Sequence, residues 1–371
     1  MNQPSPNATP LMPRLAYLDA LRGFAALYVV VYHVSLMPKP ALAMPGWLKA
    51  FVGFGGSGVT LFFIISGFSM CLSWKRHAAA ASPARSFYLN RLIRIAPLFY
   101  FWLVLAIIRD LVFKGPAGQH GLVEVGANAL FLFNLYEPFQ LGIVWASWTI
   151  GVEMLFYALF PLIKRAGFDT PAKTALLLAL SLALIVMTRP QLVDGASGQP
   201  FFRTLFDGVG FFFVLPVFLM GVVAYHAHAA LQTLAPGRLR KWLAVLLLVP
   251  AVTTLALLIA FRPDGVAWYY AAGIAYGLLL LAFAAFQRNA LVNPLTCYLG
   301  KISYSLYLNH PTLVYVLIPF YLVVYGLGLG KGLAFCACVA VTLGVLVPTS
   351  HLTFRFIEAP AMAWAKRRER R

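Results

Sequence analysis

Charged residues are scarce in this chain of 371 amino acids, and acidic residues are the scarcest. Only 11% of the residues are Asp, Glu, Lys or Arg, and Asp and Glu together number 11, whereas 61% are hydrophobic. Soluble domains carry about a quarter charged residues, so this chain lacks the side chains that solvate a globular surface. The composition excludes a soluble enzyme, a disordered chain and a fibrous repeat. It predicts an all-α polytopic membrane protein.

Cysteine is also sparse. The four cysteines, Cys71, Cys297, Cys336 and Cys338, fall within or beside apolar runs and form no C-x-x-C pair. Neither a disulfide framework nor a metal site is indicated. The net charge of +18 comes from basic residues in short loops between apolar segments, which is typical of orientation signals and of contacts with anionic lipids. We therefore expect membrane lipids, and no nucleic acid, as partners.

Long apolar runs fill most of the chain. A membrane-spanning helix needs about 20 mostly apolar residues, and Lys and Arg concentrate in alternate loops, which places both termini in the cytoplasm. We expect a cytoplasmic N-terminal tail (1–14), a transmembrane domain (15–360) and a basic cytoplasmic tail (361–371). About ten spans are predicted, at residues 15–36, 54–74, 94–114, 144–164, 172–189, 208–228, 240–261, 265–286, 299–323 and 332–356.

The first span carries charged residues, which are costly in a membrane and therefore indicate function. Arg22 and His33 are eleven residues apart, so they share a helix face within roughly 20° and are separated by about 16 Å along the axis. Asp19 is positioned to pair with Arg22. The alternative is that Arg22 reaches the cytoplasmic interface and that His33 is an interface histidine.

Two other spans carry ionisable groups. Glu153 lies in SWTIGVEMLFYALFP at a depth similar to that of His33, and its alternative role is a structural hydrogen bond. His310 is followed by Pro311, which frees a backbone carbonyl; a core histidine and a functional one fit this position equally well.

Two arginines mark the cytoplasmic side of the third span. Arg91 and Arg94 lie one helical turn apart in FYLNRLIRIAP, so two guanidinium groups can face one phosphate. Contacts with lipid headgroups explain this segment equally well.

Six segments, taken in order, resemble the integral-membrane acyltransferase-3 family, which contains bacterial O-antigen and exopolysaccharide O-acetyltransferases. They cover residues from about 15 to 360. Thr149 stands where that family usually has serine, and Asn309 where an aromatic residue is common; both differences are expected to tune the acceptor pocket. The matching segments are LDALRGFAALYVVVYHV, GVTLFFIISGF, NRLIRIAPLFY, SWTIGVEMLFYALFP, LGKISYSLYLNHP and FRFIEAP.

The resemblance implies transfer of an acetyl or other short acyl group from acyl-CoA to a hydroxyl of a cell-surface or exported carbohydrate, at the inner membrane. Acyl-CoA is then a substrate, a glycan or lipid-linked saccharide is the acceptor, and no further cofactor is implied. It also implies that Arg22, Arg91 and Arg94 hold the CoA phosphates, with the acyl arm running along the helix face from Arg22 to His33.

At the reacting end, His33 is expected to act as general base or as acyl carrier, and Glu153 to orient it. The candidate donors to the thioester carbonyl are Tyr304, Ser305 and a backbone N–H group, and the sequence does not distinguish among them. The alternatives are a macrolide or lipid acceptor within the same family and, from another class, a secondary transporter.

Overall fold

The computed structural model describes residues 15–78, 82–167, 169–192, 200–261, 266–287 and 289–369. The predicted N-terminal tail, 1–14, lies outside these ranges. No strand occurs within them, so the predicted all-α class is confirmed. The longer helices are α1 (Ala16–Leu36), α3 (Gly58–His77), α4 (Pro83–Lys114), α6 (Trp148–Arg165), α7 (Pro171–Leu192), α9 (Phe211–Gln232), α10 (Arg238–Phe261), α11 (Ala267–Ala285), α13 (Ser303–Gly326) and α14 (Lys331–Thr353).

Shorter elements connect the long helices. The predicted C-terminal tail is largely helical, because α15 continues to residue 369. The short α-helices are α2 (Gly46–Gly53), α5 (Leu122–Ala129), α8 (Pro200–Phe206), α12 (Pro294–Lys301) and α15 (Ala359–Glu369). The single turns are η1 (Gly55–Ser57), η2 (Gly115–Gly118), η3 (Phe133–Leu135), η4 (Glu137–Phe139) and the π-helical η5 (Phe354–Glu358).

A long helix overlaps each of the ten predicted spans, but the count of ten spans is corrected. Within the described ranges, eight helical segments are long and apolar enough to cross a membrane. The two predicted spans outside this set, 15–36 and 144–164, correspond to α1 and α6. Both helices carry several charged and polar side chains, which lower their mean hydropathy. The chain is a multi-pass membrane protein with about eight apolar spans.

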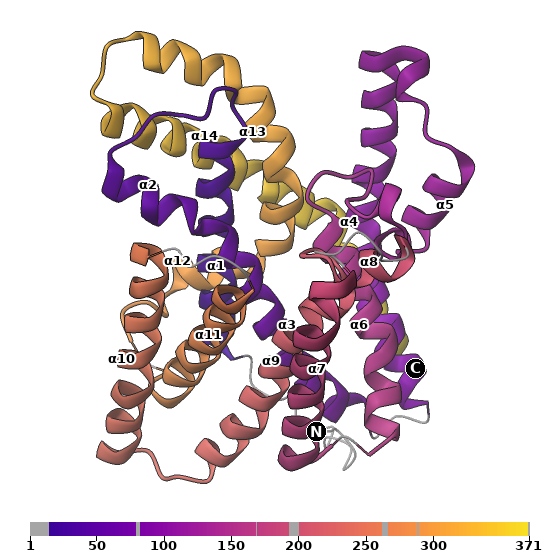
Figure 1. The fold of residues 1–371 in the computed structure, drawn as a ribbon, viewed down its shortest axis with the longest axis vertical. Helices are drawn as coiled ribbons and strands as arrows, with labels where there is room; N and C mark the ends of the chain where they lie inside the picture. The colour runs from indigo at the N-terminus through magenta and orange to yellow at the C-terminus, as the bar shows by residue number, and fades with distance from the viewer. Residues whose placement is uncertain are drawn as a thin grey trace, which may run out of the picture.

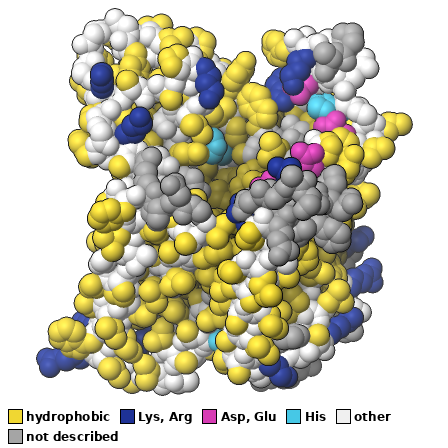
Figure 2. Space-filling view, viewed as in Figure 1, with side chains coloured by type: hydrophobic (Ala, Val, Ile, Leu, Met, Phe, Trp, Pro, Cys, Tyr) yellow, Lys and Arg dark blue, Asp and Glu magenta, His cyan; other side chains and the backbone are white. Residues whose placement is uncertain are grey.

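The helices form a bundle that divides at one end (Figure 1). In that view, α2, α13 and α14 make up the upper left part, and the upper end of α4 with α5 makes up the upper right part. The space-filling view shows a hollow between these two parts (Figure 2). A partly exposed face between helices is therefore available at this end of the molecule.

The first helix lies between two apolar cores. Leu21 and Ala25 of α1 belong to a core built mainly by α3, α4, α6, α9 and α11. Ala26 and Val30 of the same helix belong to a second core shared with α13 and α14. This double burial fixes the position of α1, and hence of the polar side chains near its two ends.

Glycines allow α12 to pack closely on α1. The start of α12 is set by a capping box, in which Asn293 Oδ1 accepts from the Thr296 amide at 3.0 Å and Thr296 Oγ1 accepts from the Asn293 amide at 3.1 Å. A Cβ atom at Gly300 would lie 1.7 Å from the carbonyl oxygen of Asp19, and one at Gly23 would lie 2.7 Å from that of Thr296. Larger residues at either position would separate the two helices.

We predict that Gly300→Ala destabilises the protein. The new methyl group would overlap the α1 backbone at Asp19, and overpacking of this kind costs about 1–3 kcal/mol or more. The purified protein in detergent should therefore unfold at a temperature several degrees lower, as measured by a thermal unfolding scan. Gly277→Ala in α11 is the matched control, because a Cβ there has no neighbour within 4 Å. Equal unfolding temperatures for the two variants would contradict the close α1–α12 contact.

Candidate functional site

Two histidines from distant parts of the chain meet in the bundle. His33 stands in the last turn of α1, and His310 lies in α13. His310 Nε2 is 3.3 Å from His33 Nδ1, and the ring centroids are 4.7 Å apart. His310 is fully buried. The structure therefore brings together two of the residues predicted from the sequence.

Backbone carbonyls assign the protons on both rings. His33 Nδ1 lies 2.8 Å from the Val29 carbonyl oxygen, and His310 Nδ1 lies 2.5 Å from that of Tyr307. A carbonyl oxygen only accepts, so each Nδ1 carries a hydrogen. His310 Nε2 is then an acceptor for His33 Nδ1–H, and His33 Nε2 keeps its lone pair. This leaves His33 with a basic nitrogen on the side away from His310.

Proline explains how His310 is held. The amide of residue 311 would ordinarily bond to the carbonyl of Tyr307, but Pro311 has no N–H. The freed carbonyl instead accepts the hydrogen bond from His310 Nδ1. The prediction that Pro311 frees a carbonyl is thus confirmed, and that carbonyl fixes the tautomer of His310.

Glu153 does not pair with His33, which corrects the role predicted for it. Its Oε1 accepts hydrogen bonds from Ser66 Oγ and from Tyr157 OH, both at 2.5 Å. In the described part of the chain, the side-chain hydrogen bonds of His33 go to Val29 and His310. The residue that orients His33 is therefore His310. Sequence spacing could not find this pair, because its members are 277 positions apart.

The predicted arginines do gather at one place. Arg22 donates to Ser69 Oγ at 2.6 Å and pairs with Asp19 at 3.3 Å. Arg91 donates to the backbone carbonyl of Ser69 at 3.4 Å, and Arg94 lies within electrostatic range of Arg22. Three guanidinium groups thus gather near the middle of α3, with Asp19 paired to Arg22 and Glu358 within electrostatic range of Arg94. A cluster of guanidinium groups suits a phosphate-bearing ligand.

One face of α3 connects the arginines to the histidines. Phe62, Ser66 and Ser69 recur at helical spacing, and they span about 10 Å along the axis. Ser69 contacts Arg22, Ser66 contacts Glu153, and Phe62 packs on the Tyr307 ring, with centroids 5.9 Å apart. Tyr307 in turn packs on His310 at 5.4 Å. A continuous set of contacts therefore runs from the basic cluster to the histidine pair.

Exposure distinguishes this face from the one predicted on α1. Ser66 and Ser69 are each 9% exposed, whereas their neighbours Ile65 and Phe68 are 1% and 0% exposed. Ala26 and Val30 of α1, which lie between Arg22 and His33, are also closed off, at 1% and 0%. The α1 face that was expected to carry the acyl arm is therefore closed between Arg22 and His33, whereas Ser66 and Ser69 are less deeply buried than their neighbours on α3. Two serines three residues apart within a mostly apolar span were the signal that the sequence analysis missed.

Tyr304 and Asn309 have structural partners. Tyr304 OH donates to the Ile95 carbonyl at 2.8 Å. Asn309 is fully buried, accepts from Trp102 Nε1 at 2.8 Å and donates to Thr353 Oγ1 at 3.0 Å. Asn309 thus joins α4, α13 and α14, and its effect on an acceptor pocket stays a prediction. Thr149 Oγ1 donates to Tyr307 OH at 3.0 Å and so lies one contact from His310.

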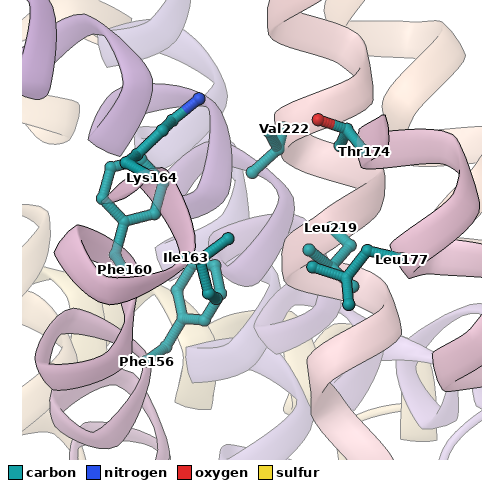
Figure 3. Close-up of a pocket in the computed structure, with 8 residues that line it drawn as sticks. All are labelled: Phe156, Phe160, Ile163, Lys164, Thr174, Leu177, Leu219 and Val222. Atoms are coloured by element: carbon teal, nitrogen blue, oxygen red, sulfur yellow. The ribbon is translucent and has the colours of Figure 1, made fainter. Parts of the chain in front are cut away.

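Two pockets lie outside this line of contacts. A void of about 10 Å³ lies between α6, α7 and α9. Figure 3 shows the side chains that line it, among them Phe156, Leu219, Lys164 and Thr174. It holds at most about one water molecule and is too small for a ligand. A wider pocket of about 300 Å³ opens at the start of α1, lined by Asp19, Tyr298 and Lys301 among others. It adjoins the basic cluster through the Asp19–Arg22 pair.

Comparison with known proteins adds to the geometry. A family model described as an acyltransferase domain, that of acyltransferase-3, matches residues 15–351. The chain belongs to the acyltransferase-3 family. It is therefore an acyltransferase, and it requires an acyl donor and an acceptor. The resemblance noted from the sequence motifs is confirmed.

Two relatives illustrate the range of the family. Nodulation protein 10 of Rhizobium leguminosarum bv. viciae is 26% identical over 326 residues, covering 81% of this chain and 83% of the relative. The O-acetyltransferase OatA of Staphylococcus aureus (strain NCTC 8325) is 23% identical over 379 residues, covering 92% of this chain. The chain spans only 56% of the length of OatA. No solved structure matches the chain significantly.

Proposed function

We propose that this membrane acyltransferase moves an acetyl or other short acyl group from acyl-CoA to a hydroxyl of a cell-surface or exported carbohydrate. The observation that carries the proposal is the histidine pair, in which His33 Nε2 keeps a lone pair while Nδ1–H is held by Val29 and His310. A fixed imidazole with one basic nitrogen is suited to take a proton from an alcohol near neutral pH.

The donor enters at the basic end. Coenzyme A carries several negative phosphate oxygens, and Arg22, Arg91 and Arg94 bring three positive charges to the middle of α3. Guanidinium groups bind phosphate through paired N–H donors. The neighbouring pocket of about 300 Å³, with Tyr298 and Lys301 in its wall, offers room for the nucleotide end of the donor.

The acyl arm lies along α3. The pantetheine part of coenzyme A is thin and has amide groups, and Ser66, Ser69 and Glu153 offer hydrogen-bonding partners along that face. The acyl arm follows this face for about 10 Å, from Ser69 to Phe62. This brings the thioester toward the histidine pair. Glu153 is then a residue of the donor passage, and its carboxylate is already held by Ser66 and Tyr157.

The reaction needs two proton transfers, one from the acceptor hydroxyl to His33 and one from His33 to the leaving thiolate. His33 Nε2 takes the hydroxyl proton of the acceptor as the oxygen attacks the thioester carbonyl carbon. The carbon–sulfur bond then breaks, and the imidazolium returns the proton to the departing thiolate of coenzyme A. His310 stabilises the charged intermediate of His33 by accepting from its Nδ1–H. In the alternative sequence, His33 Nε2 itself takes the acyl group and passes it to the hydroxyl.

The two substrates reach the protein from opposite sides of the cell membrane. Acyl-CoA is made in the cytoplasm, and we place the basic end of the bundle there, as the positive-inside rule requires. We place the protein in the inner (plasma) membrane. Support for a hydroxyl acceptor comes from the O-acetyltransferase named among the relatives, and support for a carbohydrate comes from the sequence resemblance. Macrolide and lipid acceptors are the other outcomes of the test.

The proposal is tested by mass spectrometry of surface glycans from cells with and without the protein. Glycans from cells that contain it should carry additional acyl groups, and membranes from these cells should transfer label from acetyl-CoA to the same glycans. Label that appears only in lipid or in a macrolide would contradict the carbohydrate acceptor. Absence of any labelled product would contradict acetyl transfer from coenzyme A.

A further inference from the structure

An aromatic and cationic group lies on the outward side of the histidine pair, and the function above does not use it. Trp145 packs on Tyr315 with ring centroids 5.2 Å apart, and the Arg109 guanidinium lies 4.2 Å from the centroid of the Trp145 ring. The three side chains come from the loop before α6, from α13 and from α4. We call Arg109, Trp145 and Tyr315 the aromatic platform.

The platform is attached to the histidine pair by a short set of contacts. Tyr307 OH donates to the backbone carbonyl of Ala146 at 3.0 Å, and the Tyr307 ring packs on His310. Ala146 has a φ of 62°, a left-handed conformation that is uncommon for a residue with a side chain. This backbone is kept in place by tertiary contacts, and it connects the adjacent Trp145 to His310 through Tyr307.

Access and charge favour a hydroxyl-rich, uncharged ligand. Tyr315 is 56% exposed, and Trp145 and Arg109 are partly exposed. Arg109 Nε donates to the buried Asp110 at 2.6 Å, so in the described chain its two terminal amino groups remain for other acceptors. Lys114 and His120 also contact Asp110. Glu124 pairs with His120, so Arg109 and Lys114 are nearly balanced here by Asp110 and Glu124.

We propose that the aromatic platform binds a sugar ring of the acceptor and presents its hydroxyl to His33; this inference rests on the proposed function. The negative face of an aromatic ring attracts the C–H edge of a sugar, and guanidinium N–H groups bind sugar hydroxyls. An alkyl chain would contact the aromatic rings but would form no hydrogen bond with the guanidinium group. The platform is therefore a carbohydrate subsite.

Binding is tested by saturation-transfer NMR on the protein in nanodiscs. The probes are methyl β-glucoside, methyl β-galactoside and methyl N-acetyl-β-glucosaminide, with octanol as an apolar alcohol. We expect saturation of ring C–H protons of at least one glycoside in the wild type, with strong loss in Trp145→Ala and Tyr315→Ala. Trp145→Phe keeps a ring and should retain most of the signal. Trp47→Ala is the matched control, since Trp47 of α2 is 76% exposed and lies outside the platform.

Activity provides a second readout. With labelled acetyl-CoA, Trp145→Ala should raise the KM for the glycoside roughly tenfold, as expected for loss of an aromatic contact, and should leave the KM for the donor unchanged. If glycoside binding depends on Trp145 but no acetyl transfer occurs, the subsite proposal stands and the proposed function is overturned. Equal binding in wild type and Trp145→Ala, binding of octanol alone, or no glycoside binding at all would overturn the subsite.

Discussion

Replacing His33 with alanine should lower the rate of acyl transfer by roughly 100- to 10,000-fold, the range that general acid–base catalysis contributes. The variant loses the Nε2 lone pair, which the tautomer fixed by Val29 and His310 leaves available. Transfer of label from acetyl-CoA to the acceptor in membranes measures the rate, at matched protein levels. His226→Ala is the control, because His226 lies in α9 and contacts Thr174.

A companion variant separates chemistry from orientation. His310→Gln removes the ring that accepts from His33 Nδ1–H, but it leaves the base itself in place. The rate constant should fall by roughly 10- to 100-fold, the usual effect of losing such a positioning contact, while the donor KM stays unchanged. Wild-type rates in His33→Ala would contradict the assignment of the base. A loss in His310→Gln equal to that in His33→Ala would instead show that His310 takes part in the chemistry.

Replacing Arg22 should weaken binding of the acyl donor and leave binding of the acceptor unchanged. Arg22 donates to Ser69 and faces the same region as Arg91 and Arg94, and a charged hydrogen bond to phosphate is worth about 1.5–3 kcal/mol. The KM for acyl-CoA should therefore rise roughly 10- to 100-fold in Arg22→Ala. Steady-state kinetics at varied acyl-CoA concentration measures this effect. Arg76→Ala is the control, because Arg76 is an exposed arginine in the last turn of α3, and it should have little effect.

Folding must be controlled in the Arg22 experiment. Arg22→Ala removes one cation from the buried Asp19 carboxylate, and removing one partner of a buried ion pair is destabilising. The double variant Asp19→Asn with Arg22→Gln removes both charges and should fold while still binding the donor weakly. Ser69→Ala should give a smaller rise in donor KM, since it removes only the partner of Arg22. An unchanged donor KM in the folded double variant would rule out Arg22 as a phosphate contact.

Much of the fold was predictable because a membrane-spanning helix requires a long run of apolar residues, which is visible in the sequence. A long helix overlaps each of the ten predicted segments, as apolar length requires. The number of spans was overestimated because α1 and α6 combine helical length with polar side chains. These two helices hold His33, Arg22 and Glu153, so the polar residues that mark the site also lower the hydropathy of the helices that carry them.

The site was predictable residue by residue but not contact by contact. An ionisable group in an apolar helix is visible in the sequence, and this singled out His33, Glu153 and His310. Which of them pair depends on packing between helices far apart in the chain. The sequence therefore predicts Glu153 as the partner of His33, whereas the structure pairs His33 with His310 and Glu153 with Ser66. Ser66 and Ser69 are short, common residues, and only their contacts with Glu153 and Arg22 set them apart.

The central claim is that one centre takes its donor from the basic end of the bundle and its acceptor from the hollow end. Proteoliposomes of one orientation test it most directly, with acetyl-CoA trapped on one side and a membrane-impermeant glycoside on the other. We predict acetylated glycoside only when acetyl-CoA is on the side of Arg22 and the glycoside is on the side of Trp145. Acetylation only when both substrates share one side would contradict the account.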